Sequence, residues 1–188
     1  MSNVAEAYNA LLQRWLNHYQ TLPYIPFDET WQSICLQQDS LTDIDGEPQM
    51  RWQPLLNNNK GEFENIEQAL EMTLHQDIKA YYTHLVSADL DLFHPKGPLT
   101  LLQIFNDDDF DTLGQNLIGH IMMKRQLKQR CTLFFAVTEQ DDQMISLIND
   151  TGEIWLEYVG KDPHLKLADS MADFINQLQA DESLVVAD

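Results

Sequence analysis

The middle of the chain constrains the fold most, because an apolar run, a helical pattern and a second apolar run follow one another there. Residues 99–105 read LTLLQIF and residues 132–138 read TLFFAVT. Between them, apolar side chains recur every three or four positions at Leu113, Leu117 and Ile121, which is the period of one helix face. This order predicts a helix over about 107–129 that packs on a sheet containing both apolar runs.

The remaining segments fit the same single unit. Apolar spacing predicts further helices over residues 3–19, 64–86 and 167–178. Alternation and turn residues predict strands in residues 31–36 and 50–56, a hairpin within 89–105, and a meander over 132–138, 144–150 and 153–160.

No repeat, low-complexity linker or change of composition divides the chain. We therefore predict one α+β domain over residues 1–188, with a largely antiparallel or mixed sheet flanked by helices. The prediction includes an N-terminal helix within residues 1–20 and a flexible tail over residues 180–188.

Net charge limits the kinds of partner. The chain has 188 residues, of which 44% are hydrophobic, and its 30 acidic and 11 basic residues give a formal net charge of −19. A field of this sign repels phosphate, so neither nucleic acid nor direct binding to anionic lipid is expected. Basic proteins or peptides are the natural counterpart, although a general acidic surface would have the same composition.

The cellular setting is predicted to be the cytoplasm. Cys35 and Cys131 form no CxxC pair, which favours reduced thiols. The N-terminus lacks the basic and apolar regions of a secretory signal, and no apolar run approaches the roughly 20 residues that span a bilayer. Any membrane location is therefore expected to depend on a partner.

The acidic run at residues 107–111 has three interpretations. As a calcium loop starting at Asp107 it would need glycine at the sixth position and an acid at the twelfth, but these are Thr112 and Ile118. Helix capping by Asn106, with acids in the first turn, explains part of the run. Adjacent aspartates repel each other, so the surplus favours a surface for a positive partner. No metal site or cofactor is predicted.

Catalytic signatures are absent from the sequence. It contains no GxxxxGK[ST], GxGxxG, GxSxG or HExxH motif, and no catalytic residue is predicted. A hydrolase using paired carboxylates remains an alternative from a different class. Among three tryptophans in strand-like contexts, for which core packing is the default, Trp52 is the one most expected to line a surface groove.

The block from residue 99 to 138 carries a family resemblance. Its elements LTLLQ, DDF, QNLIGH and TLFFA resemble the signature of the Syd family, the SecY-interacting proteins of gammaproteobacteria, and RWQP, GEI and FINQL extend the likeness over nearly the whole chain. The resemblance implies an α+β, non-enzymatic protein whose negatively charged concave face contacts the basic cytoplasmic loops of SecY. It also implies a cytoplasmic protein held peripherally on the inner membrane through SecY, which monitors or negatively regulates SecY assembly or activity.

The resemblance also implies candidate partner-binding residues. The acids in recognisable blocks are Asp107, Asp108 and Asp109 of DDDF and Glu153 of GEI, and a looser acidic pair follows the first helix at Asp28 and Glu29. With Trp52, these acids are the predicted site. The alternative within binding is a module for a different basic protein, as in immunity proteins of the same superfamily that neutralise toxins.

Overall fold

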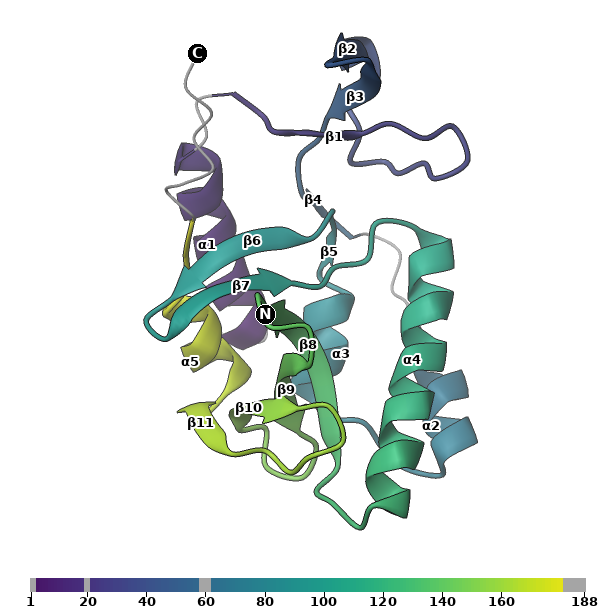
Figure 1. The fold of residues 1–188 in the computed structure, drawn as a ribbon, viewed down its shortest axis with the longest axis vertical. Helices are drawn as coiled ribbons and strands as arrows, with labels where there is room; N and C mark the ends of the chain where they lie inside the picture. The colour runs from purple at the N-terminus through teal and green to yellow at the C-terminus, as the bar shows by residue number, and fades with distance from the viewer. Residues whose placement is uncertain (1–2, 19–20, 58–61, 181–188) are drawn as a thin grey trace.

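The computed structural model describes residues 3–18, 21–57 and 62–180, and its centre is an antiparallel sheet of seven strands (Figure 1). In sheet order the strands are β11 (Leu165–Ala168), β10 (Ile154–Tyr158), β9 (Gln143–Ile148), β8 (Thr132–Thr138), β7 (Gly97–Leu101), β6 (Leu90–His94) and β12 (Gln179–Ala180). The predicted hairpin and three-strand meander are therefore adjacent parts of one sheet, joined by the pairing of β7 with β8. The predicted α+β class is confirmed.

The helix α4 (Asp107–Gln126) packs on this sheet as the central pattern predicts. Leu117 and Ile121 are fully buried, and the helix contacts β8 and α2 (Glu64–Leu70). A Cβ atom on Gly114 would lie 3.2 Å from Ile66 Cδ1, so this glycine allows α2 to approach closely.

Two predicted helices have different bounds in the structure. Residues 64–86 form two helices, α2 and α3 (Gln76–Tyr82), because Glu71 takes a left-handed conformation with φ of 50° and ends the first one. The Glu67 carboxylate then accepts a hydrogen bond from Leu74 N at 2.8 Å, which fixes the bend between the helices. The last helix, α5 (Met171–Asn176), starts later than predicted because residues 165–168 form β11.

The strand predicted at residues 31–36 is wrong. That segment is a loop, and its strand-like pairing is limited to an isolated bridge between Leu36 and Trp52. The nearby strands form a separate three-stranded sheet with the order β1 (Tyr24–Pro26), β3 (Glu47–Arg51) and β2 (Thr42–Ile44), and the one-turn helix η1 (Gln38–Ser40) lies in the preceding loop. The predicted strand at residues 50–56 is split between β3 and β4 (Leu55–Leu56), which pairs with β5 (Leu85–Val86).

Two groups of helices lie at opposite flanks of the large sheet, with α3 between them in the view of Figure 1. The first helix, α1 (Asn3–His18), packs against α5 and β12, while α2 and α4 lie together at the other flank. Of the tail predicted at residues 180–188, residue 180 belongs to β12 and the remainder lies outside the described residues. Within the described ranges, none of the helices combines the length and the apolar character needed to cross a membrane.

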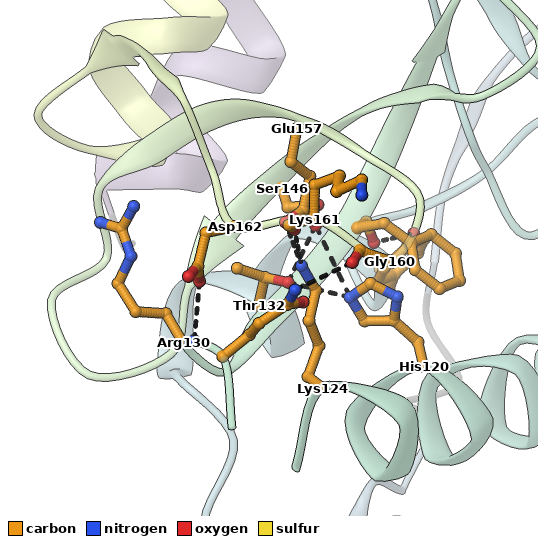
Figure 2. A network of polar contacts seen from close by, with 12 residues as sticks. His120, Lys124, Arg130, Thr132, Ser146, Glu157, Gly160, Lys161 and Asp162 are labelled. Carbon is orange, nitrogen blue, oxygen red and sulfur yellow. Dashed lines mark hydrogen bonds and ion pairs between the residues drawn. The ribbon is translucent and has the colours of Figure 1, made fainter. Parts of the chain in front are cut away.

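A buried ion pair fixes the C-terminal half of α4 to the sheet, as Figure 2 shows. Lys124 Nζ lies 2.6 Å from Glu157 Oε2 of β10, and both side chains are fully buried. The other carboxylate oxygen accepts hydrogen bonds from Thr132 Oγ1 at 2.8 Å and from Ser146 Oγ at 2.7 Å. Lys124 also donates to the Lys161 carbonyl at 2.5 Å, so each buried charge has hydrogen-bond partners besides the other charge.

His120 borders this network and has a structural role. Its Nε2 lies 2.9 Å from Thr132 Oγ1, and burial lowers the pKa of the imidazole, an effect that the nearby Glu157 opposes. Of the two cysteines, Cys35 is buried and Cys131 is half-buried, and burial raises the pKa of both thiols.

Candidate partner-binding groove

A large groove separates the small sheet from the main body of the protein. Its volume is about 1310 Å³, and it is lined by β1, β2, β3, the end of α1, the start of β6, the segment after β7 and the first turns of α4. Figure 1 shows the small sheet standing above the β6–β7 hairpin and the N-terminal end of α4. The large sheet therefore supplies one wall of the groove, and the three short strands supply the other.

Aromatic side chains form much of the groove wall. Trp52 lies on it, as predicted, but is only 5% exposed because it packs against Trp15 with ring centroids 5.4 Å apart. Trp31 is half-buried and stacks on Phe105 with a centroid distance of 4.1 Å. The groove is therefore built around rigid aromatic side chains, which supply a large contact area at small entropic cost.

The acidic start of α4 lies at one edge of the groove. Asn106 caps the helix by accepting a hydrogen bond from Asp109 N at 3.0 Å. The Asp109 carboxylate accepts from Phe105 N at 3.1 Å and from Trp31 Nε1 at 3.3 Å, and it lines the groove. Asp107 and Asp108 are exposed on the same turn. The capping and surface interpretations therefore apply to different residues of one run.

The second predicted acidic pair is brought close to this turn. Asp28 Oδ1 accepts hydrogen bonds from Thr30 N and Thr30 Oγ1, both at 2.7 Å, and these bonds lower the pKa of the carboxyl. Asp28 and Glu29 are exposed, and the chain after them contacts α4, because Asn106 Nδ2 donates to the Gln32 carbonyl at 3.2 Å. Two acidic stretches that are far apart in sequence thus lie on neighbouring segments.

Glu153 lies apart from the other predicted residues. Its carboxylate pairs with Lys166 and accepts from Trp155 Nε1 at 3.2 Å, and the bond from Lys166 is the main reason why its pKa is lowered. It does not belong to the groove lining. Of the seven predicted residues, Trp52 and Asp109 line the groove, while Asp28, Glu29, Asp107 and Asp108 lie outside the lining on the segments that carry Trp31 and Asp109. Glu153 lies beside β10 and β11.

Two further acids of the groove, Asp89 and Asp91, are not among the residues predicted from the sequence. Asp89 Oδ1 accepts from Gln103 N at 2.7 Å, and Asp91 Oδ1 accepts from Thr100 Oγ1 at 2.6 Å. Partial burial raises the pKa of Asp89, and the neighbouring carboxylates of Asp109 and Asp91 raise it further. The signal that could have found them is the alternation DLDL, which places both acids on the face of β6 opposite the fully buried Leu92.

Metal-ligating side chains are not grouped at this groove. Across residues 3–18, 21–57 and 62–180, no three His, Cys, Asp or Glu side chains are placed so as to hold a metal ion. The carboxylates instead line a wide, aromatic groove, whose size suits a protein segment better than an ion.

The fold and the groove define a single α+β domain with carboxylates set in an aromatic groove. Comparison with known proteins gives the family: residues 1–180 match the family model described as Syd protein (SUKH-2), and the chain belongs to the Syd family. The family expected from the sequence is confirmed.

Several relatives are named protein Syd. That of Colwellia psychrerythraea is 43% identical over 185 residues, covering 94% of this chain and 88% of the relative. That of Alteromonas mediterranea is 44% identical over 154 residues, covering 82% and 83%. That of Shewanella frigidimarina is 39% identical over 179 residues, covering 93% and 81%.

Proposed function

We propose that this chain is a non-enzymatic binding protein that docks on the basic cytoplasmic loops of the SecY translocon channel. In this role it is a cytoplasmic protein held at the inner membrane through SecY, and it monitors or negatively regulates the assembly or activity of the channel. The observation that carries the proposal is the aromatic groove, which contains Asp89, Asp91 and Asp109 and has the exposed Asp107 and Asp108 on its helical edge.

Charge supports this choice of partner. Cytoplasmic loops of membrane proteins carry an excess of Lys and Arg, so SecY presents positive segments on that side. A chain with a net charge of −19 is steered toward such a surface and away from anionic lipid. The charged residues of the groove lining are three aspartates, one arginine and one histidine, which gives the groove the same sign as the whole chain.

Charge pairs alone do not give a stable complex. Each exposed pair contributes about 0–1 kcal/mol, whereas a micromolar complex needs about 8 kcal/mol. The aromatic walls provide the apolar contact that makes up the difference. Exposed apolar side chains on the small-sheet side of the groove, including Tyr24 and Ile44, add to this surface.

Binding fits these features better than the hydrolase alternative does. General acid–base work by two carboxylates needs environments that drive their pKa values apart around a reacting bond. Asp89 and Asp91 instead each accept a hydrogen bond from the fold and lie in an open groove. The alternative, an immunity-type module for another basic protein, would use the same groove. Only a test of which partner binds distinguishes it from the SecY proposal.

The test measures binding to inverted inner-membrane vesicles that contain or lack SecY. We expect binding that requires SecY and weakens as salt rises, because screening acts over about 8 Å at physiological ionic strength. Changing both Asp107 and Asp108 to Lys should weaken binding by at least about tenfold, which is roughly 1.4 kcal/mol. Asp109 is left unchanged, since its carboxylate bonds Phe105 N and Trp31 Nε1 within the fold.

The matched control changes Glu139 and Asp141 to Lys. These exposed acids lie in the turn between β8 and β9, outside the groove lining, and the substitution changes net charge by the same amount. We expect the control to retain most of the binding. Equal binding to vesicles without SecY would contradict the proposal, and tight binding to a basic toxin with none to SecY would favour the immunity alternative.

A further inference from the structure

We infer that the end of the groove bounded by Asp89, Asp91, Asp109 and Trp31 is an anchor pocket for one arginine side chain of the partner. The inference rests on the proposed function and adds which side chain of a basic loop enters the groove and where it is held.

The carboxylates of this pocket come from two elements that the fold brings together. Asp89 and Asp91 lie at the start of β6, and Asp109 lies in the first turn of α4. All three line the same groove and bond one short segment, because Asp89 accepts from Gln103 N and Asp109 accepts from Phe105 N, two residues further along. Asp91 is two residues from Asp89 and accepts from Thr100 Oγ1, so the three charges lie along the same stretch of chain. A single cation at this end of the groove would therefore interact with more than one carboxylate.

Within the described residues, no cation pairs with these three carboxylates. None of the ion pairs formed within the described residues includes Asp89, Asp91 or Asp109. The one guanidinium in the groove lining, that of Arg51, stacks on Tyr24 at 4.6 Å and donates to Tyr24 Oη at 3.0 Å. By contrast, the half-buried Glu153 is paired with Lys166, so the chain does provide cations for carboxylates elsewhere.

The aromatic wall favours arginine over lysine. Trp31 stacks on Phe105 and donates its indole N–H to Asp109, so an aromatic ring and a carboxylate are fixed side by side. A planar guanidinium can stack on an aromatic face while its N–H groups bond carboxylates, and it is less strongly hydrated than an ammonium group. Lysine would satisfy the charge but would gain less from the ring.

The test uses a blocked amino acid as the probe, N-acetyl-arginine methylamide, followed by the NMR signals of the tryptophan indole N–H groups. Trp31 reports directly on the pocket, because its indole bonds Asp109, and Trp155 serves as an internal control because its indole bonds Glu153 outside the groove. We expect a saturable shift of the Trp31 signal with a dissociation constant of about 1–10 mM, since one side chain makes few contacts. The Trp155 signal should not move.

Two comparisons make the result specific. Blocked lysine should bind at least about threefold more weakly than blocked arginine, because it loses the stacking contribution. Changing Asp89 and Asp91 to Asn keeps acceptor oxygens for Gln103 N and Thr100 Oγ1 but removes two charges, and it should weaken the arginine shift at least about fivefold. The variant Asp91→Asn alone tests the same point if the double variant fails to fold.

The control variant, Glu139→Gln with Asp141→Asn, removes two acids outside the groove and should leave the arginine titration unchanged. A Trp31 signal that does not respond, equal affinity for arginine and lysine, or an unaltered titration in the Asp91→Asn variant would each overturn the inference.

Vesicle binding distinguishes failure of the arginine pocket from failure of the proposed function. SecY binding that survives the loss of Asp89 and Asp91 charge overturns the anchor alone, whereas absence of SecY binding by the native chain overturns the proposed function.

Discussion

Glu157 and Asp89 are both carboxylates that accept hydrogen bonds from the fold, and they have opposite surroundings. Glu157 is fully buried, and Lys124, Thr132 and Ser146 bond its two oxygens (Figure 2). Asp89 receives one backbone hydrogen bond, has two acidic neighbours, and has no ion pair within the described residues. The charge of Glu157 is neutralised by Lys124 of the same chain, whereas the charge of Asp89 remains for a partner to neutralise.

The helix α4 connects the two arrangements. Its C-terminal half supplies Lys124 to the internal network, and its first turn supplies Asp109 to the groove. Leu113, Leu117 and Ile121 lie between them and hold the helix on the sheet. One rigid element thus carries a fully compensated charge at one end and uncompensated charges at the other, so substitutions at the two ends should separate stability from binding.

The largest effect is expected for Lys124→Met. This change removes the cation and leaves Glu157 buried without a charge partner, and breaking such a pair costs about 3–5 kcal/mol. Urea unfolding followed by circular dichroism measures the loss. Adding Glu157→Gln to Lys124→Met should restore at least half of it, because the unpaired charge is then gone while Thr132 and Ser146 keep an acceptor. If the double variant is as unstable as the single one, the loss of stability comes from packing and not from the unpaired charge of Glu157.

A smaller effect is expected at the other end of α4. Asn106→Ala removes both the helix cap and the bond to the Gln32 carbonyl, and should lower the free energy of unfolding by about 1 kcal/mol. Asn106→Ser retains a capping oxygen and should lower the free energy of unfolding by less.

Asp108→Asn should leave stability nearly unchanged and weaken binding to SecY-containing vesicles. The opposite pattern, with a destabilised fold and intact binding, would assign the acidic run to structure.

The sequence predicts the central fold well because its signals are local. The helical period of Leu113, Leu117 and Ile121, and the apolar runs on either side, are sufficient to place α4 against the sheet that contains β7 and β8. The break between α2 and α3 was missed because the same apolar spacing runs through both helices, and the left-handed turn at Glu71 leaves no pattern of its own.

The candidate site was predicted only in part, for a related reason. Asp107, Asp108 and Asp109 are visible as a run, and Trp52 is visible as an aromatic residue in a short strand. The contact between Trp31 and Asp109 joins residues 78 positions apart, and no local pattern encodes it. Asp89 and Asp91 are hidden in an ordinary alternating strand, so their role depends on the small sheet that forms the opposite wall of the groove.

The smallest expected effect tests the uncompensated side of the comparison directly. The pKa of Asp89 is raised above its ordinary value of 3.8, so the folded protein holds this proton more tightly than the unfolded chain does. Stability is therefore lost as pH rises from about 3.8 through the raised folded value, and the cost persists at neutral pH. Asp89→Asn should make the protein more stable than the native chain at pH 7, by less than about 1 kcal/mol because the carboxylate is open to water. The gain should vanish near pH 3 and shrink in high salt, as urea unfolding at each condition would measure. A loss of stability at pH 7 would mean that the bond from Gln103 N outweighs the repulsion, and Asp89 would then belong with Glu157 among the compensated carboxylates.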